Sequence, residues 1–352
     1  KTNNLNTFKN LKKLKLKEIL SMTGGVLKGN PELSINSITS IDKYKVGSIS
    51  PLWESKFVPL ATSKMVLLTK PGWIPEGASG VEVEDPRRAL VFLLEYFDSF
   101  IIEKPFVSKS ALVSGHSTIG ENVYIGPNSV VSEGSVLSDD AVLLGNVWIG
   151  KHVTIGKNTI IEQGVVIHDF VTIGENCIIH SNAVIGSDGF GFMPDGEKGL
   201  LRIPQIGNVV VEDNVEIGSC SCIDKATFGE TLISKGTKID SLVKVGHNCR
   251  IGANCILVSQ SGIAGSTILE EGVTIAAQVG IANHATIGAR TTIGARAGVI
   301  KDVPKDKIYS GFPAQEHREE LRQQVALRTL PKLIKEIKEL KEKIEGLTQK
   351  DD

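Results

Sequence analysis

A histidine and an aspartate lie seven residues apart in the segment IDSLVKVGHNCRIG, at Asp240 and His247. A neutral imidazole can accept a proton near pH 7, and a carboxylate can orient the ring and stabilise its protonated form. The pair therefore suggests general-base chemistry. The alternative is an ordinary polar surface, because outward-facing histidines often have no catalytic role.

Two further features could contribute to a site. His284 follows His247 by 37 residues. The segment GSDGFGFMPDGEKGLLRIPQIG (186–207) contains six glycines together with Phe190 and Phe192. A phosphate-binding glycine loop would lead into a helix N-terminus, and no helix is expected here. The segment is therefore interpreted as a wall of a ligand pocket, or else as a loop that closes a coil.

A six-residue repeat predicts the elements that position these residues. An aliphatic residue recurs at every sixth position for fourteen repeats, from Val107 to Ile185. The register resumes over 211–223, slips once, and runs again over 233–299. The residue two positions earlier is small or β-branched, so both residues face inward from a short strand. A glycine often follows, which suits a sharp corner where a Cβ would crowd the backbone.

This pattern predicts a parallel β-helix. Hexapeptide repeats are typical of that fold, and each coil can bury its apolar side only against its neighbours. In such a coil His247 lies just past a corner and points outward, and Asp240 lies just past the preceding corner. Four other histidines are also expected to face outward: His116, His152, His168 and His180.

The flanking segments do not carry the repeat. Residues 1–102 predict a small α/β domain, with helices before Gly24-Gly25 and over 86–97 and strands within 35–41 and 65–69. Residues 103–312 form the β-helix, and residues 313–352 predict α-helices, one on each side of Pro331. Apolar residues form a heptad seam here: Leu330, Leu333, Ile337, Leu340, Ile344 and Leu347. Lysines at 332, 335, 338, 341 and 343 mark a solvated helix face or a docking surface for an acidic partner.

Composition narrows the functional classes. The net charge of -1 argues against a nucleic-acid-binding protein. The sequence has no run of 18 apolar residues, so no membrane-spanning helix is predicted. Five cysteines without paired CxxC spacing disfavour a disulfide framework or a zinc ribbon, so a reducing cytoplasm is expected. Cys177, Cys249 and Cys255 occupy the small inward position and predict packing, and Cys220 and Cys222 are expected to pack as well.

Three segments carry a more specific pattern: GSDGFGF (186–192), RIPQIGNVVVEDNVEIGSCSCIDKATFGETLISKGTKIDSLVKVGHNCRIG (202–252) and YSGFPA (309–314). With the N-terminal LKEILSMTGGVLKGNPELSINSITSID, they cover essentially the whole chain. In this order the segments resemble the UDP-3-O-acylglucosamine N-acyltransferases, which act early in lipid A biosynthesis.

The resemblance implies a mainly β protein with a left-handed parallel β-helix, three hexads per coil, and a homotrimer with active sites between neighbouring prisms. It makes His247 the general base with Asp240 as its partner. It assigns the oxyanion donor to the backbone N–H of Gly265 and places His284 near the sugar phosphates. It also implies a set of substrate contacts: Phe190, Phe192, Gln205, Asn248, Lys56 and Phe57.

The implied reaction moves an acyl chain from acyl carrier protein to the 2-amino group of UDP-3-O-acylglucosamine, giving UDP-2,3-diacylglucosamine. Neither a cofactor nor a metal is implied. Acyl carrier protein is acidic, which favours the docking interpretation of the C-terminal lysines.

The implied uridine pocket departs from the family pattern. The family usually has a phenylalanine followed by an Asn-Pro-Lys-Tyr run, whereas GSISPLWESKF gives Pro51 and then Glu54 to Phe57. Phe57, helped by Trp53, could stack on uracil in place of the tyrosine, or both rings could belong to the domain core. A related transferase acting on another UDP-amino sugar is therefore an alternative.

Three other functions compete with this one. A coenzyme-A-dependent acyltransferase of the same superfamily would lack the N-terminal domain and have a different C-terminus. A hexapeptide-repeat carbonic anhydrase would need three histidines around zinc between chains. A non-catalytic β-helix scaffold would tolerate the loss of His247 or Asp240.

Overall fold

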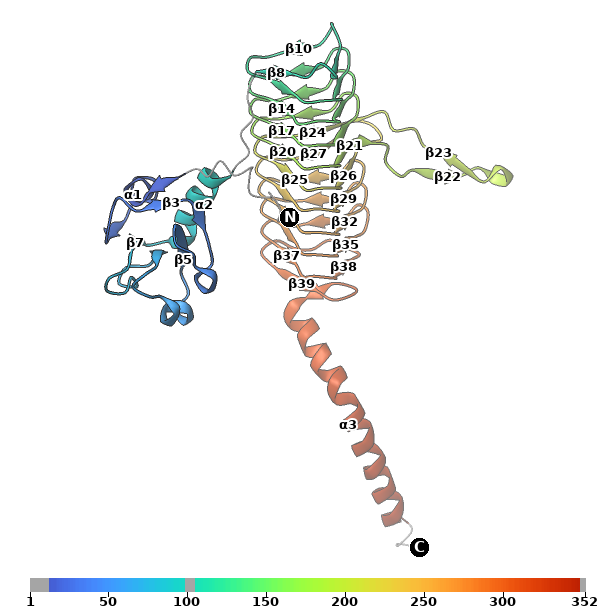
Figure 1. Cartoon of the computed structure of the whole chain (residues 1–352). Coiled ribbons are helices and arrows are strands. Elements are labelled where there is room, and N and C mark those ends of the chain that lie inside the picture. Colours follow the sequence, from blue (N-terminus) through green and yellow to red (C-terminus); the bar gives the residue numbers. More distant parts are fainter. Residues whose placement is uncertain (1–12, 99–104, 349–352) are drawn as a thin grey trace, which may run out of the picture. The chain divides into compact units, whose positions relative to one another are not determined.

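The computed structural model describes residues 13–98 and 105–348, which belong to two compact units, Lys1–Ile102 and Glu103–Asp352. The first unit is a small α/β fold and the second is a long β-helix with an arm and a C-terminal helix (Figure 1). Within the described residues, no helix is long and apolar enough to cross a membrane.

The first unit packs two helices against a five-stranded sheet. Helix α1 (Leu16–Thr23) ends at Gly24, and Asp85 caps α2 (Pro86–Phe97) by accepting hydrogen bonds from two backbone N–H groups. The sheet order is β2 (Val26–Lys28), β7 (Ser79–Glu82), β6 (Val66–Thr69), β5 (Ser48–Leu52) and β4 (Ser37–Ile38), and β1 (Leu14–Lys15) pairs with β3 (Ser34–Ile35). Both helices lie where the sequence predicts them. The strand predicted over 35–41 is instead divided between β3, β4 and a 3-10 turn, η1 (Ile41–Lys43).

The second unit winds through three parallel sheets, here named I, II and III in the order in which the chain meets them. Sheet I contains β8 (Phe106–Val107), β11 (Tyr124–Ile125), β14 (Val142–Leu143), β17 (Ile160–Ile161), β20 (Ile178–Ile179), β25 (Glu216–Ile217), β28 (Lys238–Ile239), β31 (Ile256–Leu257), β34 (Thr274–Ile275), β37 (Thr292–Ile293), β39 (Ile308–Ser310) and the antiparallel β40 (Gln315–Glu316).

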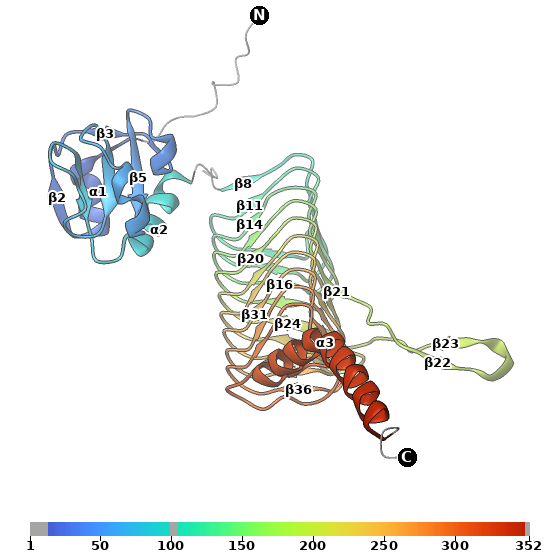
Figure 2. The same cartoon turned by 90° about the horizontal axis from the view of Figure 1, so that it is seen from below.

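Sheet II contains β9 (Leu112–Val113), β12 (Val130–Val131), β15 (Trp148–Ile149), β18 (Val166–Ile167), β21 (Val184–Ser187), β26 (Cys222–Asp224), β29 (Lys244–Val245), β32 (Gly262–Ile263), β35 (Gly280–Ile281) and β38 (Gly298–Val299). Sheet III contains β10 (Thr118–Ile119), β13 (Val136–Leu137), β16 (Thr154–Ile155), β19 (Thr172–Ile173), β24 (Asn208–Val211), β27 (Glu230–Ile233), β30 (Arg250–Ile251), β33 (Ile268–Leu269) and β36 (Thr286–Ile287). Figure 2 shows the coils stacked one on another.

The hexad aliphatics fill the interior of this stack, as predicted. From Ile125 to Val299 they are buried, whereas Val107 in the first coil is exposed because no coil covers it. The glycine after the aliphatic lies where a Cβ would crowd the backbone, as expected, and the crowded backbone is that of the next coil. A Cβ on Gly126 would overlap the Leu144 carbonyl group of the next coil, so close stacking of coils requires the glycine. The left-handed backbone falls two residues later and is often taken by asparagine, as at Asn128 (φ 58°).

Two excursions leave the β-helix. An arm between β21 and β24 carries the hairpin of β22 (Phe192–Pro194) and β23 (Leu200–Arg202) (Figures 1 and 2). The C-terminal segment forms a single helix, α3 (His317–Thr348), with Pro331 inside it. The predicted break at Pro331 is therefore wrong. A proline removes one backbone donor and crowds one preceding carbonyl, and the turns on both sides continue the helix past that local defect.

Candidate functional site

Most of the predicted site residues lie along one edge, where each coil passes from sheet II to sheet III. We call this edge the II–III corner. His247 follows β29, Gly265 follows β32 and His284 follows β35, and these three strands pair in sequence. The arm also leaves and rejoins the β-helix at this corner. His284 is thus on the same edge as His247.

The imidazole of His247 lies between two glycines. A Cβ on Gly265 would stand 2.6 Å from Nε2 of His247, and a Cβ on Gly189, at the root of the arm, would stand 2.7 Å from Cβ of His247. Both distances are shorter than real contacts between such atoms. The ring occupies space that only glycine at 189 and 265 leaves open.

A side-chain amide holds the other ring nitrogen. Nδ1 of His247 lies 3.1 Å from Oδ1 of Asn248. That oxygen also accepts a 2.9 Å hydrogen bond from the Thr227 backbone N–H, and Nδ2 of Asn248 donates to the Phe228 carbonyl at 2.9 Å. Thr227 and Phe228 were not among the predicted residues. The only signal for them was the slip of the hexad register between Ile223 and Ile233.

Gln205 braces the arm against this corner. Its Oε1 accepts a 2.9 Å hydrogen bond from the Thr227 hydroxyl, and its Nε2 donates to the Ile203 carbonyl at 3.1 Å. The side chain is 6% exposed. Gln205 therefore joins the arm root to the coil that carries Thr227, and its amide is already engaged in the single chain.

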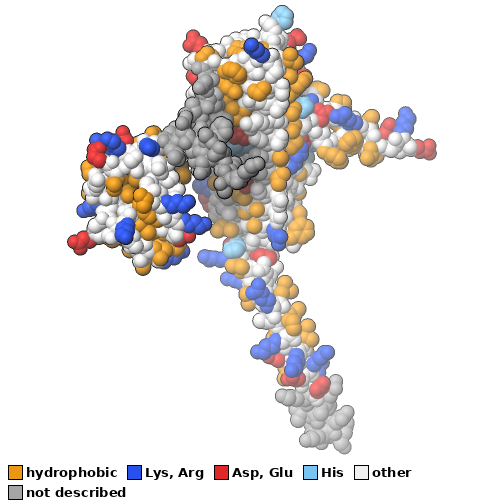
Figure 3. All heavy atoms as spheres, in the orientation of Figure 1, with side chains coloured by type: hydrophobic (Ala, Val, Ile, Leu, Met, Phe, Trp, Pro, Cys, Tyr) orange, Lys and Arg blue, Asp and Glu red, His pale blue; other side chains and the backbone are white. Residues whose placement is uncertain are grey.

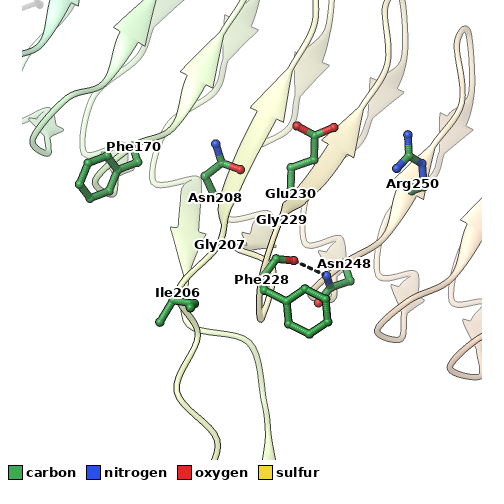
Figure 4. Close-up of a pocket in the computed structure, with 9 residues that line it drawn as sticks. All are labelled: Phe170, Ile206, Gly207, Asn208, Phe228, Gly229, Glu230, Asn248 and Arg250. Atoms are coloured by element: carbon green, nitrogen blue, oxygen red, sulfur yellow. Dashed lines mark hydrogen bonds between the residues drawn. The ribbon is translucent and has the colours of Figure 1, made fainter.

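An open groove of about 780 Å³ runs beside the seat of His247. Its lining is Phe170, Ile206, Gly207, Asn208, Phe228, Gly229, Glu230, Asn248 and Arg250 (Figure 4). His247 itself does not line the groove, but Asn248 lines it and also contacts the imidazole, so Asn248 links the two. The arm aromatics Phe190 and Phe192 are exposed, with ring centroids 5.2 Å apart, and they do not line this groove in the single chain.

Asp240 lies at a different edge, where coils pass from sheet I to sheet II, which we call the I–II corner. Its carboxylate accepts hydrogen bonds from the backbone N–H groups of Ser241 (2.7 Å) and Ser259 (3.1 Å), and these bonds lower the pKa of the carboxyl. Strand β29 separates it from His247. Within one chain the expected contact between Asp240 and His247 is therefore not made, because residues one hexad apart occupy successive corners rather than adjacent coils.

Gly265 and His284 stand in the next two coils. The Gly265 N–H has no acceptor in the part of the chain that the structure describes, and its carbonyl accepts the His284 N–H at 3.2 Å. His284 is exposed and adopts a left-handed backbone with φ 60°. Gly265, which packs against the His247 ring, thus has an N–H without an acceptor among the described residues, and a second imidazole lies further along the same edge.

Comparison with known proteins identifies the fold and the family. The model described as bacterial transferase hexapeptide (six repeats) matches residues 152–187 and 230–265, and that of the hexapeptide repeat of succinyl-transferase matches 117–151. The crystal structure of an Arabidopsis UDP-N-acetylglucosamine acyltransferase shares the fold, with a TM-score of 0.55 and 23% identity over 62% of this chain and 77% of that one. The left-handed parallel β-helix expected from the sequence is confirmed.

Relatives in sequence are more informative. A UDP-3-O-acylglucosamine N-acyltransferase 1 of Gloeobacter violaceus is 55% identical over 163 residues, a match that spans about half of each chain (46% of both). The UDP-3-O-acylglucosamine N-acyltransferase of Syntrophus aciditrophicus is 49% identical over 340 residues, which cover 95% of this chain and 93% of that one. The chain belongs to the UDP-3-O-acylglucosamine N-acyltransferase family.

In this family member, the predicted N-terminal aromatics surround a pocket of about 220 Å³. Trp53 and Phe57 both line it, together with Asp42, Pro51 and Glu54. Lys56 does not line the pocket. Its Nζ lies 2.6 Å from Glu54 and 4.7 Å from the centre of the Phe57 ring, so it contacts two residues that line the pocket.

The cysteines of this family member differ among themselves. Cys177, Cys249 and Cys255 are buried as predicted, and burial raises the pKa of the Cys249 thiol to about 12. The packing prediction is wrong for Cys220, which is exposed at a corner with φ 60°, and Cys222 is only half-buried on the outer face of sheet II. Among residues 13–98 and 105–348, no group of three or more His, Cys, Asp or Glu side chains is placed to hold a metal ion.

Proposed function

We propose that this chain is an N-acyltransferase that moves an acyl group from acyl carrier protein to the 2-amino group of UDP-3-O-acylglucosamine. The observation that carries the proposal is the seat of His247. An imidazole there has one nitrogen held by the Asn248 amide and the other packed against Gly265, whose N–H has no acceptor among the described residues. Asn248 also lines an open groove. A full-length relative, 49% identical, is named for this activity.

The residues support a base-assisted acyl transfer. The substrate amine attacks the thioester carbonyl, and the new C–N bond forms as a proton passes from the amine to Nε2 of His247. The carbonyl oxygen becomes an oxyanion, for which the Gly265 N–H is the donor. The C–S bond then breaks, and the imidazolium returns its proton to the departing sulfur. To His284, two coils away at the same corner, we assign contact with negative charge on the substrate.

The proposed active form is a homotrimer, since Asp240 lies at another corner within one chain. If Asp240 assists His247, a neighbouring subunit must supply it. Helix α3 supports self-association, because the heptad residues Leu330, Leu333 and Ile337 are about half exposed in the single chain. Figure 3 shows hydrophobic side chains on the surface of this helix. Three such helices could bury their seams together. Sedimentation of the full chain at a trimer mass is expected, and a stable monomer would contradict this assembly.

The charges of α3 favour helix–helix contact over docking of an acidic protein. Residues 330–348 contain five lysines and four glutamates, so this part of the helix is almost neutral. Lys332 lies 3.7 Å from Glu336 and Lys335 lies 3.9 Å from Glu339, each pair one turn apart. Contact of acyl carrier protein with 313–352 remains a proposal, and neutralising these lysines should raise KM for the acyl donor if it is correct. A cytoplasmic location is proposed with it, since the acyl donor and the unpaired cysteines both suit a reducing compartment.

The N-terminal pocket favours one alternative acceptor class. Pro51 and Glu54 stand where the family usually places a phenylalanine and an asparagine, and two carboxylates, Asp42 and Glu54, line the pocket. Uracil stacking on Phe57 is compatible with this lining. The second candidate is a transferase that acts on another UDP-amino sugar.

The decisive experiment offers the purified chain several acyl carrier proteins of different acyl length with UDP-3-O-acylglucosamine and detects the N-acylated product by mass. The proposal expects a product with a mass increase of one acyl group. Failure with every donor, together with turnover of a different UDP-amino sugar, would transfer the assignment to the second candidate.

A further inference from the structure

The orientation of the Asn248 amide can be determined from its partners. The oxygen and nitrogen of an asparagine side chain are hard to distinguish by shape, so only hydrogen bonding assigns them. Here the two partners are backbone groups of fixed polarity. The Thr227 N–H can only donate and the Phe228 carbonyl can only accept, and they lie 2.9 Å from Oδ1 and 2.9 Å from Nδ2 respectively. No other orientation of the amide satisfies both.

The fixed amide determines which imidazole nitrogen carries the proton. Oδ1 of Asn248 has no hydrogen, and it lies 3.1 Å from Nδ1 of His247. The contact is a hydrogen bond only when Nδ1 is the donor. In the neutral ring the lone pair is then on Nε2. Nε2 is also the atom that faces Gly265, where a Cβ would stand only 2.6 Å away.

The irregular coil before this corner supplies both backbone partners. Between β26 and β27 the chain takes four residues more than one hexad, and the Thr227 N–H and Phe228 carbonyl belong to this insertion. Asn248 itself is anchored by its own N–H, which donates to the Thr231 hydroxyl at 2.8 Å, and by the fully buried Cys249 that follows it. The register slip, which the β-helix alone does not require, therefore has a use at the site.

We propose that Asn248 is a positioning residue that holds His247 in the Nδ1–H tautomer, so that Nε2 is the proton acceptor. The inference deepens the proposed function and rests on it for its kinetic consequences, but the tautomer itself does not depend on the reaction. Within one chain, Asn248 supplies the orientation that the sequence pattern attributes to Asp240. The resemblance to the family had placed Asn248 among substrate contacts instead.

The chain offers a matched control. Asn254 also adopts a left-handed backbone (φ 56°, against 59° for Asn248) and also precedes a buried cysteine, but it lies at the corner between sheets III and I. Asn254→Ala removes the backbone preference of asparagine without touching His247. Asn248→Ala removes the same preference and the amide. Asn248→Asp keeps an oxygen acceptor for Nδ1 and removes the donor to Phe228.

The test is nitrogen NMR of the full chain with labelled histidine, at a pH where His247 is neutral, combined with steady-state kinetics. We expect the His247 proton on Nδ1 in the wild type, Asn254→Ala and Asn248→Asp, and a mixture of tautomers in Asn248→Ala. We also expect kcat of Asn248→Ala to fall about 10- to 100-fold with little change in KM, which is the usual cost of removing a group that orients an imidazole. In Asn248→Asp we expect kcat to recover in part.

Two results would overturn the inference. One is a wild-type His247 with its proton on Nε2, which needs no variant to fold. The other is a folded Asn248→Ala with an unchanged tautomer and unchanged kcat. If the wild type shows the Nδ1–H tautomer but acylates no UDP-amino sugar, the proposed function fails and the positioning role stands.

Discussion

Two histidines at neighbouring corners of the β-helix have opposite surroundings. At the I–II corner, Nδ1 of His180 lies 3.1 Å from Glu162 and Nε2 lies 2.9 Å from Glu216. At the II–III corner, His247 has one nitrogen on the neutral amide of Asn248 and the other beside Gly265. A ring held between two carboxylates is stabilised as a cation and has no free lone pair, whereas a ring held by one amide oxygen can accept a proton.

The pKa of His180 is consistent with this contrast. Partial burial lowers it, but the hydrogen bonds and charges of Glu216 and Glu162 outweigh the burial, and the pKa is raised above its ordinary 6.5. Both histidines would look alike in a list of outward-facing residues. The identity of the groups on the two ring nitrogens separates a structural imidazolium from a candidate base.

Among substitutions that leave His247 itself in place, the largest effect should come from crowding the candidate base. In Gly265→Ala the new Cβ would stand 2.6 Å from Nε2 of His247, so the ring must move. We expect kcat to fall about 100-fold, because displacement of a catalytic group by about 1 Å costs that much. The thermal midpoint should change little, since a ring end can shift more easily than backbone. Full activity in Gly265→Ala would show that the seat of His247 is not where the reaction occurs.

A glycine at the other corner should affect stability instead. In Gly126→Ala the Cβ would overlap the Leu144 carbonyl of the next coil, and backbone cannot move aside as a ring does. We expect a loss of about 1–3 kcal/mol in the free energy of unfolding, which is typical of overpacking, with near-normal kcat in the folded fraction. Calorimetry and the mass assay on the same sample measure the two quantities. If Gly126→Ala lost activity but not stability, the two corners would not differ in the way proposed here.

The smallest effect should be the pH dependence of the His180 cluster. A raised pKa in the folded chain means that the cluster stabilises the fold fully below the unfolded pKa and loses this contribution as the pH rises through the folded value. His180→Gln should therefore lower the free energy of unfolding more at pH 6 than at pH 9. The difference should be about 1 kcal/mol or less, because the ion pairs are partly exposed, and thermal unfolding at the two pH values measures it. An equal loss at both pH values would mean that the ring is not held as a cation.

The fold could be predicted from the sequence because its rule is local. Every coil needs the same aliphatic residue at the same interval, so Ile125 and Ile293 report the same environment 168 residues apart. Pro331 could not be judged in this way, because whether a helix continues past a proline depends on the turns beside it. Cys220 occupies the left-handed corner position three residues after the buried Ile217, where the repeat leaves side chains exposed rather than packed.

The site was less predictable because the residues that meet there come from different stacked coils, from the arm and from the inserted residues before β27. Asp240 and His247 are close in sequence but lie at different corners, whereas His247 and Gly265, eighteen residues apart, are adjacent. Gly189 and Gln205 reach the corner through the arm, and Thr227 reaches it through the inserted residues before β27. No six-residue rule contains that information. The resemblance to the family named His247, Gly265 and Asn248, and the coordinates were needed to show how they are held.

The most direct measurement compares the turnover of His247→Ala with that of His180→Ala, using acyl carrier protein donors and UDP-3-O-acylglucosamine, with each variant in the same oligomeric state as the wild type. The account predicts a loss of about two to four orders of magnitude in kcat for His247→Ala, the usual contribution of a general base, and near-normal kcat for His180→Ala. Near-normal turnover by His247→Ala would contradict it, and so would a comparable loss in both variants.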